Sequence, residues 1–422
     1  MKNTDHYKNK RVTVVGLARS GAACANLLYE LGADVCVTDN KDTDITRANL
    51  LRLKSKNIKV ELGRHSQGFI RNRDLIVISP GVPNSASPVL WAEELKIPII
   101  SEIELAWHLC PGKIIAVTGS NGKTTVTTLI GRMLEEWGRR VFVCGNIGNP
   151  FSGEVKKIRE DDWVSLEVSS FQLERIQRFK PKISVILNFT FNHLDRYKDM
   201  QEYLNAKKRI FMNQERTDCL VLNYEDPALR GLAKETEANI IYFSGTQRLD
   251  SNKACVLAIG SILGIDERSL LKVFREFKGL EHRLEYVAEI NNINFINDSK
   301  ATTADSAIWA LKNINSPIVL IAGGKDKGVD YNIILDSARK KVKEVILIGE
   351  AKEKIARVFR GILSIDEAVT LQEAVRKAYS KAKAGDSVLL SPMCSSFDMF
   401  SDYEERGRVF KEAVYALARE EN

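Results

Sequence analysis

Short apolar runs that end in glycine-rich or polar turns recur along the chain, and segments with helical periodicity follow many of them. Apolar runs lie at 12–15, 34–38, 75–78, 114–117, 163–166, 183–187, 293–296, 317–322, 345–348 and 388–390. After the run at 114–117, one helical face collects Val126, Leu129, Ile130, Met133, Leu134 and Trp137. This alternation predicts an α/β protein with mainly parallel sheets.

Chain length and turn-prone segments predict three domains. The chain has 422 residues, and a domain commonly holds roughly 150. Cys110-Pro111-Gly112 and the segment 279–283 separate complete α/β units. We therefore expect a Rossmann-like domain at 1–110, a central phosphate-loop domain of the ATPase type with a parallel sheet at 111–281, and a second Rossmann-like domain at 282–422.

Composition excludes several classes of protein. The charge of +7 comes from 62 basic and 55 acidic residues spread along the chain, which argues against a nucleic-acid partner. The seven cysteines form no C-x-x-C pair, which argues against a disulfide framework or a zinc site. The N-terminus lacks the pattern of a signal peptide, and no apolar run approaches the roughly 20 residues that span a bilayer. We expect a cytoplasmic protein.

The turn at 16–21, GLARSG, follows the first strand, and the second strand ends at Asp39. This arrangement resembles a dinucleotide-binding turn with its acidic residue about 20 positions later. Ala18 stands at the middle glycine position, where its methyl group hinders approach of a pyrophosphate. A nucleotide other than NAD, or none, is therefore expected. Ser79-Pro80-Gly81 forms another strand-end turn that could face a ligand.

The segment 118–125, TGSNGKTT, lies between an apolar strand and an amphipathic helix. This order predicts a phosphate loop, in which backbone amides and the helix N-terminus attract an anion. Lys123 would bind the β/γ-phosphates and Thr124 would bind Mg²⁺. The usual spacing places a glycine where Val117 stands, whereas Gly119 comes only three residues before Gly122. The alternative is a chance Gly-Lys-Thr turn.

Other candidate residues follow predicted strands, where ligands bind in α/β sheets. Glu167 is placed to bind Mg²⁺, or it is an ordinary strand-end carboxylate. His193 stands beside acidic and basic residues, although a lone histidine is often structural. Asp298 or Ser299 could belong to a site or cap the next helix.

Together these motifs resemble the Mur ligase family over nearly the whole chain. The shared motifs are TGSNGKTT at 118–125, NIGNP at 146–150, LEVSSFQLE at 166–174, NHLDRY at 192–197, AKKRIF at 206–211, HR at 282–283, NDSKATT at 297–303 and AGGKDKG at 322–328. The branch that adds D-glutamate is indicated by GLARSG at 16–21, SPGVP at 79–83 and SPMCSSFDMFSDYEERG at 391–407. The Asp-Asn-Pro-Arg signature of the branch that adds a diamino acid or lysine is absent.

The resemblance implies an ATP-dependent amide ligase that adds D-glutamate to UDP-N-acetylmuramoyl-L-alanine through an acyl phosphate, in cytoplasmic peptidoglycan precursor synthesis. It implies ATP and two Mg²⁺ ions, and we expect a monomer. The three domains would bind the UDP substrate, ATP and the amino acid in chain order. The alternatives are another Mur or folylpolyglutamate-type ligase, or a phosphate-loop NTPase without ligase chemistry.

The resemblance also implies roles for individual residues. ATP would contact Gly119, Ser120, Asn121, Gly122, Lys123, Thr124, Thr125, Asn252, Arg283 and Asp298. Magnesium would be bound by Thr124, Glu167, His193 and a carbamylated Lys207. The UDP substrate would contact Arg19, Ser20, Asp39, Asn40, Ser79, Gly81 and Asn146. D-Glutamate would lie among Thr302, Lys327, Ser396, Phe397 and Tyr403. The catalytic residues would be Lys123, His193, Lys207 and Lys300.

Overall fold

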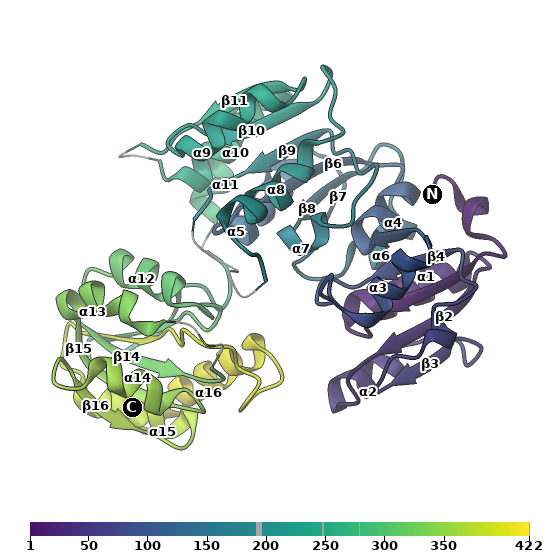
Figure 1. The fold of residues 1–422 in the computed structure, drawn as a ribbon. Helices are drawn as coiled ribbons and strands as arrows, with labels where there is room; N and C mark the ends of the chain where they lie inside the picture. Colours follow the sequence, from purple (N-terminus) through teal and green to yellow (C-terminus); the bar gives the residue numbers. More distant parts are fainter. Residues whose placement is uncertain (191–195, 247–248, 278, 327, 329, 422) are drawn as a thin grey trace. The chain divides into compact units, whose positions relative to one another are not determined.

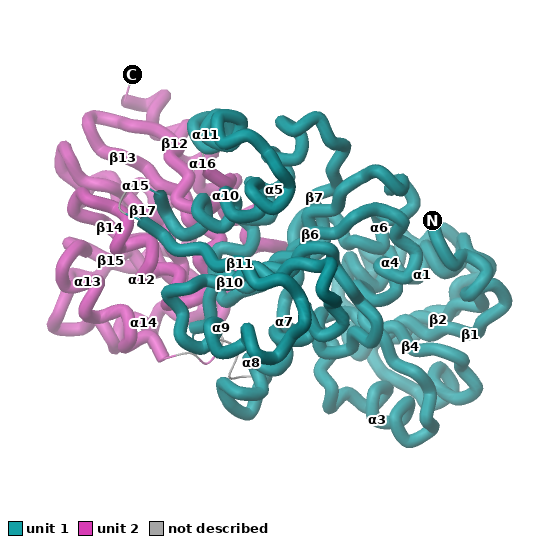
Figure 2. The backbone as a smooth tube through the Cα atoms, turned by 90° about the horizontal axis from the view of Figure 1, so that it is seen from above, with its two compact units in different colours: residues 1–277 teal, residues 278–422 magenta. Residues whose placement is uncertain are grey.

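The computed structural model describes residues 1–190, 196–246, 249–277, 279–326, 328 and 330–421. The chain divides into two compact units, 1–277 and 278–422, which Figure 2 shows in teal and magenta. Figure 1 labels many of the helices and strands. Each unit is built from α/β layers, as the alternation of apolar runs and helical segments predicts.

The first sheet is parallel and has the order β3-β2-β1-β4-β5. Strands β1 to β3 are added toward one edge of the sheet, and β4 and β5 are added on the other side of β1. The switch point between β1 and β4 is where ligands bind in open α/β sheets. The strands are β1 (Arg11–Val15), β2 (Asp34–Asp39), β3 (Lys59–Leu62), β4 (Leu75–Ile78) and β5 (Ile99–Ser101). The helices are α1 (Arg19–Glu30), α2 (Asp44–Leu50), α3 (Ser87–Glu94) and α4 (Glu102–Leu109), with short 3-10 turns η1 (Thr4–Tyr7) and η2 (Gln67–Phe69).

The second sheet is also parallel, in the order β11-β10-β9-β6-β8-β7. Alternate residues of β6 enter different cores, Ile114 and Ala116 on one face and Ile115 and Val117 on the other. A strand covered on both faces reads as a continuous apolar run. The strands are β6 (Lys113–Thr118), β7 (Val141–Gly145), β8 (Trp163–Glu167), β9 (Ile183–Ile186), β10 (Cys219–Asn223) and β11 (Asn239–Phe243).

Helices cover both faces of this second sheet. They are α5 (Lys123–Glu136), α6 (Phe151–Glu154), α7 (Ser170–Leu173), α8 (Met200–Lys208), α9 (Pro227–Gly231), α10 (Ser251–Leu263) and α11 (Glu267–Glu276), with η3 (Val155–Lys157), η4 (Arg209–Phe211) and η5 (Leu232–Glu235). One hydrophobic core contains residues from Tyr7 to Ala238. The first two sheets therefore share a core within the first unit.

The third sheet has the order β12-β13-β17-β14-β15-β16 and is mixed, because β12 runs antiparallel to β13. β12 was not predicted from the sequence. Asn291 and Asn292 both have positive φ, 49° and 61°, and join the two strands in a tight hairpin. The strands are β12 (Glu285–Ile290), β13 (Ile293–Asn297), β14 (Ile318–Gly323), β15 (Val342–Ile348), β16 (Ser364–Glu367) and β17 (Ser387–Leu390).

The helices of the second unit pack on both faces of the mixed sheet. They are α12 (Ala304–Asn313), α13 (Leu335–Lys341), α14 (Lys352–Phe359), α15 (Leu371–Lys381) and α16 (Tyr403–Glu421), with η6 (Tyr331–Ile334). In β14, Leu320 enters one core and Ile321 enters the other. Across the described residues, no helix has the length and apolar character needed to cross a membrane.

Candidate active site

The segment 118–125 forms a loop between the carboxyl end of β6 and the first residue of α5. Gly122 precedes α5 with φ of 80°, a left-handed conformation that favours glycine. A Cβ atom on Gly122 would lie 2.6 Å from Oδ1 of Asn252, so α10 begins close against this loop. Asn252, a predicted ATP contact, and the predicted phosphate loop are therefore brought together.

The end of β9 fixes the conformation of this loop. The backbone N–H of Asn121 donates to Oδ1 of Asn188 at 2.8 Å, and Nδ2 of Asn188 donates to the Asn121 carbonyl at 3.1 Å. Ser120 Oγ donates to the Thr190 carbonyl at 3.1 Å and accepts from the Thr190 N–H at 3.0 Å. Asn188 was not predicted as a site residue. Asn188 could have been identified from the sequence because it follows a predicted strand, where ligands bind in α/β sheets.

Two lysine ammonium groups converge on one carbonyl oxygen of the loop. Lys123 donates to Gly119 O at 2.9 Å and to Ser120 O at 3.0 Å, and Lys207 donates to the same Gly119 O at 3.0 Å. Lys207 is 1% exposed, and its Nζ lies 4.4 Å from the centre of the Tyr203 ring. Among the described residues, no carboxylate pairs with Lys207. Lys123 thus places a positive charge beside the loop, where an anion would bind.

The environment of Lys207 disfavours its charged form. Burial lowers the pKa of the Lys207 ammonium well below its usual range, and the nearby positive charge of Lys123 lowers it further. A neutral amine at this position is a nucleophile, whereas an ammonium is not. The site therefore has the chemistry that reaction with CO₂ requires.

Glu167 ends β8 next to the phosphate-loop strand β6. Its Oε1 accepts a hydrogen bond from Nδ2 of Asn146 at 2.8 Å, so two predicted site residues lie in direct contact. Its Oε2 is buried and has no hydrogen-bond partner among the described residues. A buried carboxylate oxygen without a donor is costly, and Mg²⁺ prefers such oxygen ligands. Glu167 and the buried Thr124 thus fit a magnesium ion.

Apart from Asn146, which follows β7 of the second sheet, the predicted UDP-substrate residues lie near the carboxyl ends of β1, β2 and β4 in the first sheet. Both carboxylate oxygens of Asp39 accept backbone N–H groups, from Leu17 at 2.6 Å and from Lys41 at 2.9 Å. Ser79 Oγ donates to the Gly16 carbonyl at 2.9 Å. Asp39 and Ser79 therefore shape the GLARSG turn. The remaining predicted residues of this group are exposed or half-buried: Arg19, Ser20, Asn40 and Gly81.

In the second unit, the structure places Arg283 next to Asp298. Leu284 N–H donates to Asp298 Oδ1 at 3.2 Å, and Ser391 Oγ donates to Asp298 Oδ2 at 3.0 Å. Burial raises the pKa of Asp298 to about 7, although Ser391 and Arg283 act in the opposite direction. Thr303 caps α12 by accepting the N–H of Ser306, so neither Asp298 nor Ser299 is the helix cap.

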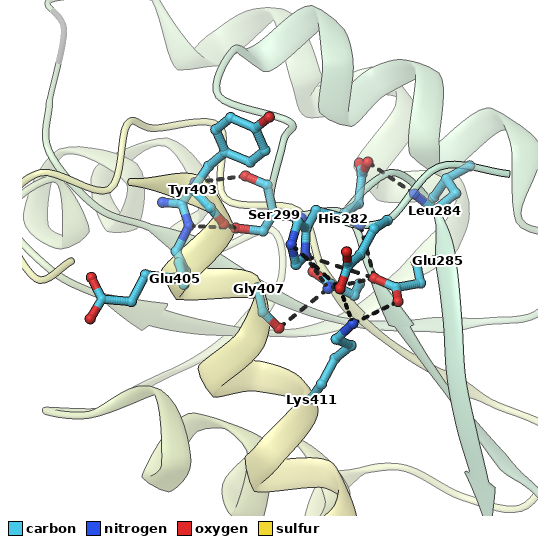
Figure 3. A network of polar contacts seen from close by, with 12 residues as sticks. His282, Leu284, Glu285, Ser299, Tyr403, Glu405, Gly407 and Lys411 are labelled. Atoms are coloured by element: carbon cyan, nitrogen blue, oxygen red, sulfur yellow. Dashed lines mark hydrogen bonds and ion pairs between the residues drawn. The ribbon is translucent and has the colours of Figure 1, made fainter. Parts of the chain in front are cut away.

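A buried polar network, shown in Figure 3, holds the residues on either side of Arg283. The N–H of His282 donates to Glu285 Oε2 at 2.8 Å, and Asn297 Nδ2 lies 2.9 Å from His282 Nδ1 and 3.0 Å from Glu285 Oε2. The ligand atoms of Glu281, His282 and Glu285 lie within 4.8 Å of one another, a spacing that a cation could occupy. Lys411 pairs with both carboxylates, so a side-chain cation already offsets part of their charge.

The same network continues to the predicted amino-acid site. Lys300 N–H donates to the His282 carbonyl at 3.0 Å, and Lys300 Nζ lies 5.4 Å from the centre of the Tyr403 ring. Thr302 N–H donates to the Lys300 carbonyl at 2.8 Å. Arg283, Asp298, Lys300 and Tyr403 are thus held in one connected framework. After β17, Ser396 is buried and Phe397 is 60% exposed.

Arg406 was not predicted as a site residue, although the structure buries it beside Ser299. Its Nε donates to Ser299 Oγ at 3.0 Å, and its Nη2 donates to the carbonyls of Ser299 at 2.8 Å and Cys394 at 3.1 Å. Nη1 is buried without a partner among the described residues. Burial lowers the pKa of Arg406 to about 10. The helical spacing of 406, 410, 414 and 417 could have revealed that this arginine shares the apolar face of α16.

His193 and Lys327, both predicted site residues, lie outside the described residues. The structure brings the other predicted residues together in three groups. The first group surrounds the phosphate loop. The second group lies near the switch point between β1 and β4 in the first sheet, and the third lies near the carboxyl ends of β13 and β17. A phosphate loop with a strand-end carboxylate and two lysines defines an ATP-using class of enzyme.

The chain belongs to the Mur ligase family. Three family models match it in order: the MurD-like N-terminal domain over 10–101, the Mur ligase middle domain over 117–261, and the Mur ligase glutamate ligase domain over 282–394. A relative from Thermoanaerobacter sp. (strain X514), named UDP-N-acetylmuramoylalanine–D-glutamate ligase, is 41% identical over 98% of this chain and 99% of its own.

Solved structures share the fold. The UDP-N-acetylmuramate–alanine ligase of Thermotoga maritima superimposes with a TM-score of 0.63 at 19% identity. The match covers 97% of this chain and 100% of that one. The MurF ligase of Thermotoga maritima, in complex with ADP, gives a TM-score of 0.59 at 15% identity and covers 99% of this chain and 98% of that one. The expected α/β class is confirmed by these matches.

Proposed function

We propose that this chain is an ATP-dependent ligase that joins D-glutamate to UDP-N-acetylmuramoyl-L-alanine in peptidoglycan precursor synthesis. The observation that carries the proposal is the family membership, with a D-glutamate ligase 41% identical over 98% of the chain. The convergence of Lys123 and Lys207 on Gly119 supports ATP chemistry at the phosphate loop. The reaction takes place in the cytoplasm, and the chain acts as a monomer.

In the first step, the free carboxylate of the acceptor attacks the γ-phosphorus of ATP, and ADP leaves. This step brings two anions together, and Lys123 offsets the charge that develops on the transferring phosphoryl group. Gly119, Ser120, Asn121, Gly122, Thr124 and Thr125 cradle the phosphates, while Asn252 contacts the adenine. Arg283 binds the phosphates and Asp298 the ribose.

Magnesium, when bound, would polarise the phosphoryl oxygens and neutralise their charge. Thr124, Glu167, His193 and carbamylated Lys207 are the proposed ligands, and two ions are expected. Asn146 fixes Glu167 through their 2.8 Å hydrogen bond and so orients its second oxygen. Asn146 also contacts the acceptor in this proposal.

Lys207 acquires its role by reaction with CO₂. The neutral amine attacks the carbon of CO₂, a C–N bond forms, and one proton leaves, which gives an N-linked carboxylate. The low pKa of Lys207 favours the neutral amine that this reaction needs. The product replaces a cation with oxygen ligands, which suit Mg²⁺.

In the second step, the neutral amine of D-glutamate attacks the acyl phosphate and inorganic phosphate leaves. Lys300, Thr302, Lys327, Ser396, Phe397 and Tyr403 form the proposed amino-acid site. Arg19, Ser20, Asp39, Asn40, Ser79 and Gly81 form the proposed UDP-substrate site. Excluding water from the acyl phosphate protects it from hydrolysis while the amine is positioned.

Phosphate release tests the proposal. Purified protein is given ATP, Mg²⁺ and UDP-N-acetylmuramoyl-L-alanine, and each of several amino acids in turn. D-Glutamate should support release, and omission of either co-substrate should abolish it. Preference for another amino acid or another UDP acceptor would assign the chain to a different amide ligase. Release that needs neither co-substrate would identify a simple NTPase.

A further inference from the structure

The guanidinium group of Arg196 binds the turn that follows β4. Nη1 of Arg196 donates to the Pro80 carbonyl at 3.0 Å, and Nη2 donates to the Val82 carbonyl at 3.1 Å. These two carbonyls stand on either side of Gly81. Arg196 comes from the segment before α8, so it joins the part of the first unit that holds the phosphate loop to the turn of the first sheet.

The guanidinium is itself held in one orientation. Nη2 donates to Glu174 Oε2 at 2.8 Å, and the group lies 4.2 Å from the centre of the Phe171 ring. Glu174 Oε1 accepts from the Tyr197 hydroxyl at 2.7 Å, and Glu174 Oε2 also accepts from Asn84 Nδ2 at 3.0 Å. The side chains of Arg196 and Glu174 are 15% and 8% exposed. Such a network permits one geometry, since any shift leaves a buried polar group unpaired.

Other contacts hold the two sheets of the unit together. The Glu104 carboxylate accepts the backbone N–H groups of Gln177, Arg178 and Phe179 at 2.8 to 2.9 Å. A continuous hydrophobic core also joins the two sheets. The packing of the unit therefore does not depend on Arg196, and the local effect of Arg196 is on the shape and charge of the turn at 80–82.

The turn presents a donor to a ligand. The N–H of Gly81 has no partner in the described part of the chain, and the space beside its Cα is open. The flanking carbonyls, which would repel an anion, are both engaged by the positive guanidinium. The turn therefore offers an N–H group next to neutralised carbonyls, an arrangement suited to a phosphate or a carbonyl oxygen.

We propose that Arg196 is a positioning residue for the UDP-bearing substrate, acting through the turn at 80–82. The proposal rests on the proposed function, which places Ser79 and Gly81 in the UDP-substrate site. Arg196 fixes the direction of the Gly81 N–H and, through Glu174, keeps this turn at a set distance from the central sheet. A lysine cannot replace it, because one ammonium lacks the planar fork that binds two carbonyls and a carboxylate together.

The test compares Arg196→Lys and Arg196→Gln with the wild type and with Arg175→Gln. Arg175 is a matched control because it also joins the two sheets, through Asn84 at 2.8 Å and Glu93 at 2.7 Å. It reaches the same network through Asn84, which bonds Glu174, but among the described residues its guanidinium bonds side chains and not the carbonyls of the turn. Affinities for UDP and for UDP-N-acetylmuramoyl-L-alanine are measured by calorimetry. KM for each substrate and the thermal midpoint are measured for each variant.

Both Arg196 variants should bind UDP and the UDP substrate roughly tenfold or more weakly, the loss expected for hydrogen bonds to a charged group. Their KM for the UDP substrate should rise similarly, while KM for ATP and for D-glutamate stays within about twofold of wild type. Arg175→Gln should match wild type in all of these values. Unchanged binding in Arg196→Lys would overturn the proposal, and so would an equal rise in KM for ATP or a large fall in the thermal midpoint of that variant.

Wild-type controls separate this proposal from the proposed function. If the wild type fails to bind UDP compounds or to form product with D-glutamate, the assignment of the site is wrong, whatever the variants do. If the wild type binds and turns over normally while Arg196→Lys equals it, only the positioning role is wrong.

Discussion

Lys207 and Gly119 are 88 positions apart in the sequence, and Nζ of Lys207 lies 3.0 Å from the carbonyl oxygen of Gly119. The same oxygen accepts from Lys123 at 2.9 Å. The amines of Lys123 and Lys207 thus share one acceptor at a buried position. A positive charge on Lys207 is disfavoured there by burial and by the charge of Lys123. The proposed carbamate would remove this conflict by turning the Lys207 amine into an anion beside the Lys123 cation.

Replacement of Lys207 tests that role. Lys207→Ala should lose most activity, because a magnesium ligand is removed, and added acetate should restore part of it by occupying the vacated space. Lys207→Arg should be inactive and should not respond to acetate, since its guanidinium fills the space. Turnover of both variants is measured with and without acetate. Full activity of the Ala variant would make Lys207 an ordinary buried lysine, and failure of acetate would remove the main support for the carbamate.

Lys123→Ala should lower turnover roughly 10²–10³-fold, because one positive charge near the transferring phosphoryl group is lost. The fold should persist, since the hydrogen bonds of Lys123 to the carbonyls of Gly119 and Ser120 lie within its own loop and their loss removes no buried apolar contact. Phosphate release and circular dichroism check both statements. Near-normal turnover in this variant would refute the assignment of 118–125 as the phosphate loop.

Gly407→Ala should destabilise the second unit. An added Cβ would lie 2.1 Å from Nδ1 of the buried His282, so the ring or α16 must move. Overpacking of this kind costs about 1–3 kcal/mol. Urea unfolding measures the change, with Gly231→Ala as control because a Cβ there meets nothing within 4 Å. Equal stability of the two variants would contradict the packing described for His282.

Asp298 should make stability depend on pH. Burial raises its pKa from 3.8 to about 7, so between these values the folded chain keeps a proton that the unfolded chain has lost. The free energy of unfolding should therefore fall as pH rises through this range, by up to about 1.4 kcal/mol per pH unit. Asp298→Asn should remove this component. Urea unfolding of both proteins across the range is the measurement, and a constant difference between them would rule out the raised pKa.

Limited proteolysis tests the proposed domains 1–110, 111–281 and 282–422. We expect the first cuts near 278–284, where the chain passes from one compact unit to the next. The boundary at 110–112 should resist longer, because Gly112 packs closely and a Cβ there would lie 2.7 Å from Ile158. Fragments sized by mass spectrometry report the order of cutting. Early cuts within 12–100 would argue against this plan.

The sequence alone determined the α/β class and the location of the phosphate loop. Strands such as 114–117 and 317–322 are covered on both faces, so they appear as continuous apolar runs bounded by glycine turns. The motif residues lie at the ends of strands because ligands bind at the carboxyl ends of strands in open α/β sheets. Asn146 follows β7 and Glu167 ends the neighbouring strand β8 of the same parallel sheet, so their proximity could be expected from topology.

Only the tertiary structure showed which polar groups meet. Arg196 and Pro80 are 116 positions apart, and no local pattern reports a hydrogen bond across that separation. Helical spacing could place Arg406 on the apolar face of α16, but its partner Ser299 lies 107 positions away in the sequence and no local pattern identifies it. Local periodicity is set by backbone geometry and burial, so the sequence carries it directly. Partners for buried charges depend on how whole elements pack, and that is decided only when the sheets and helices come together.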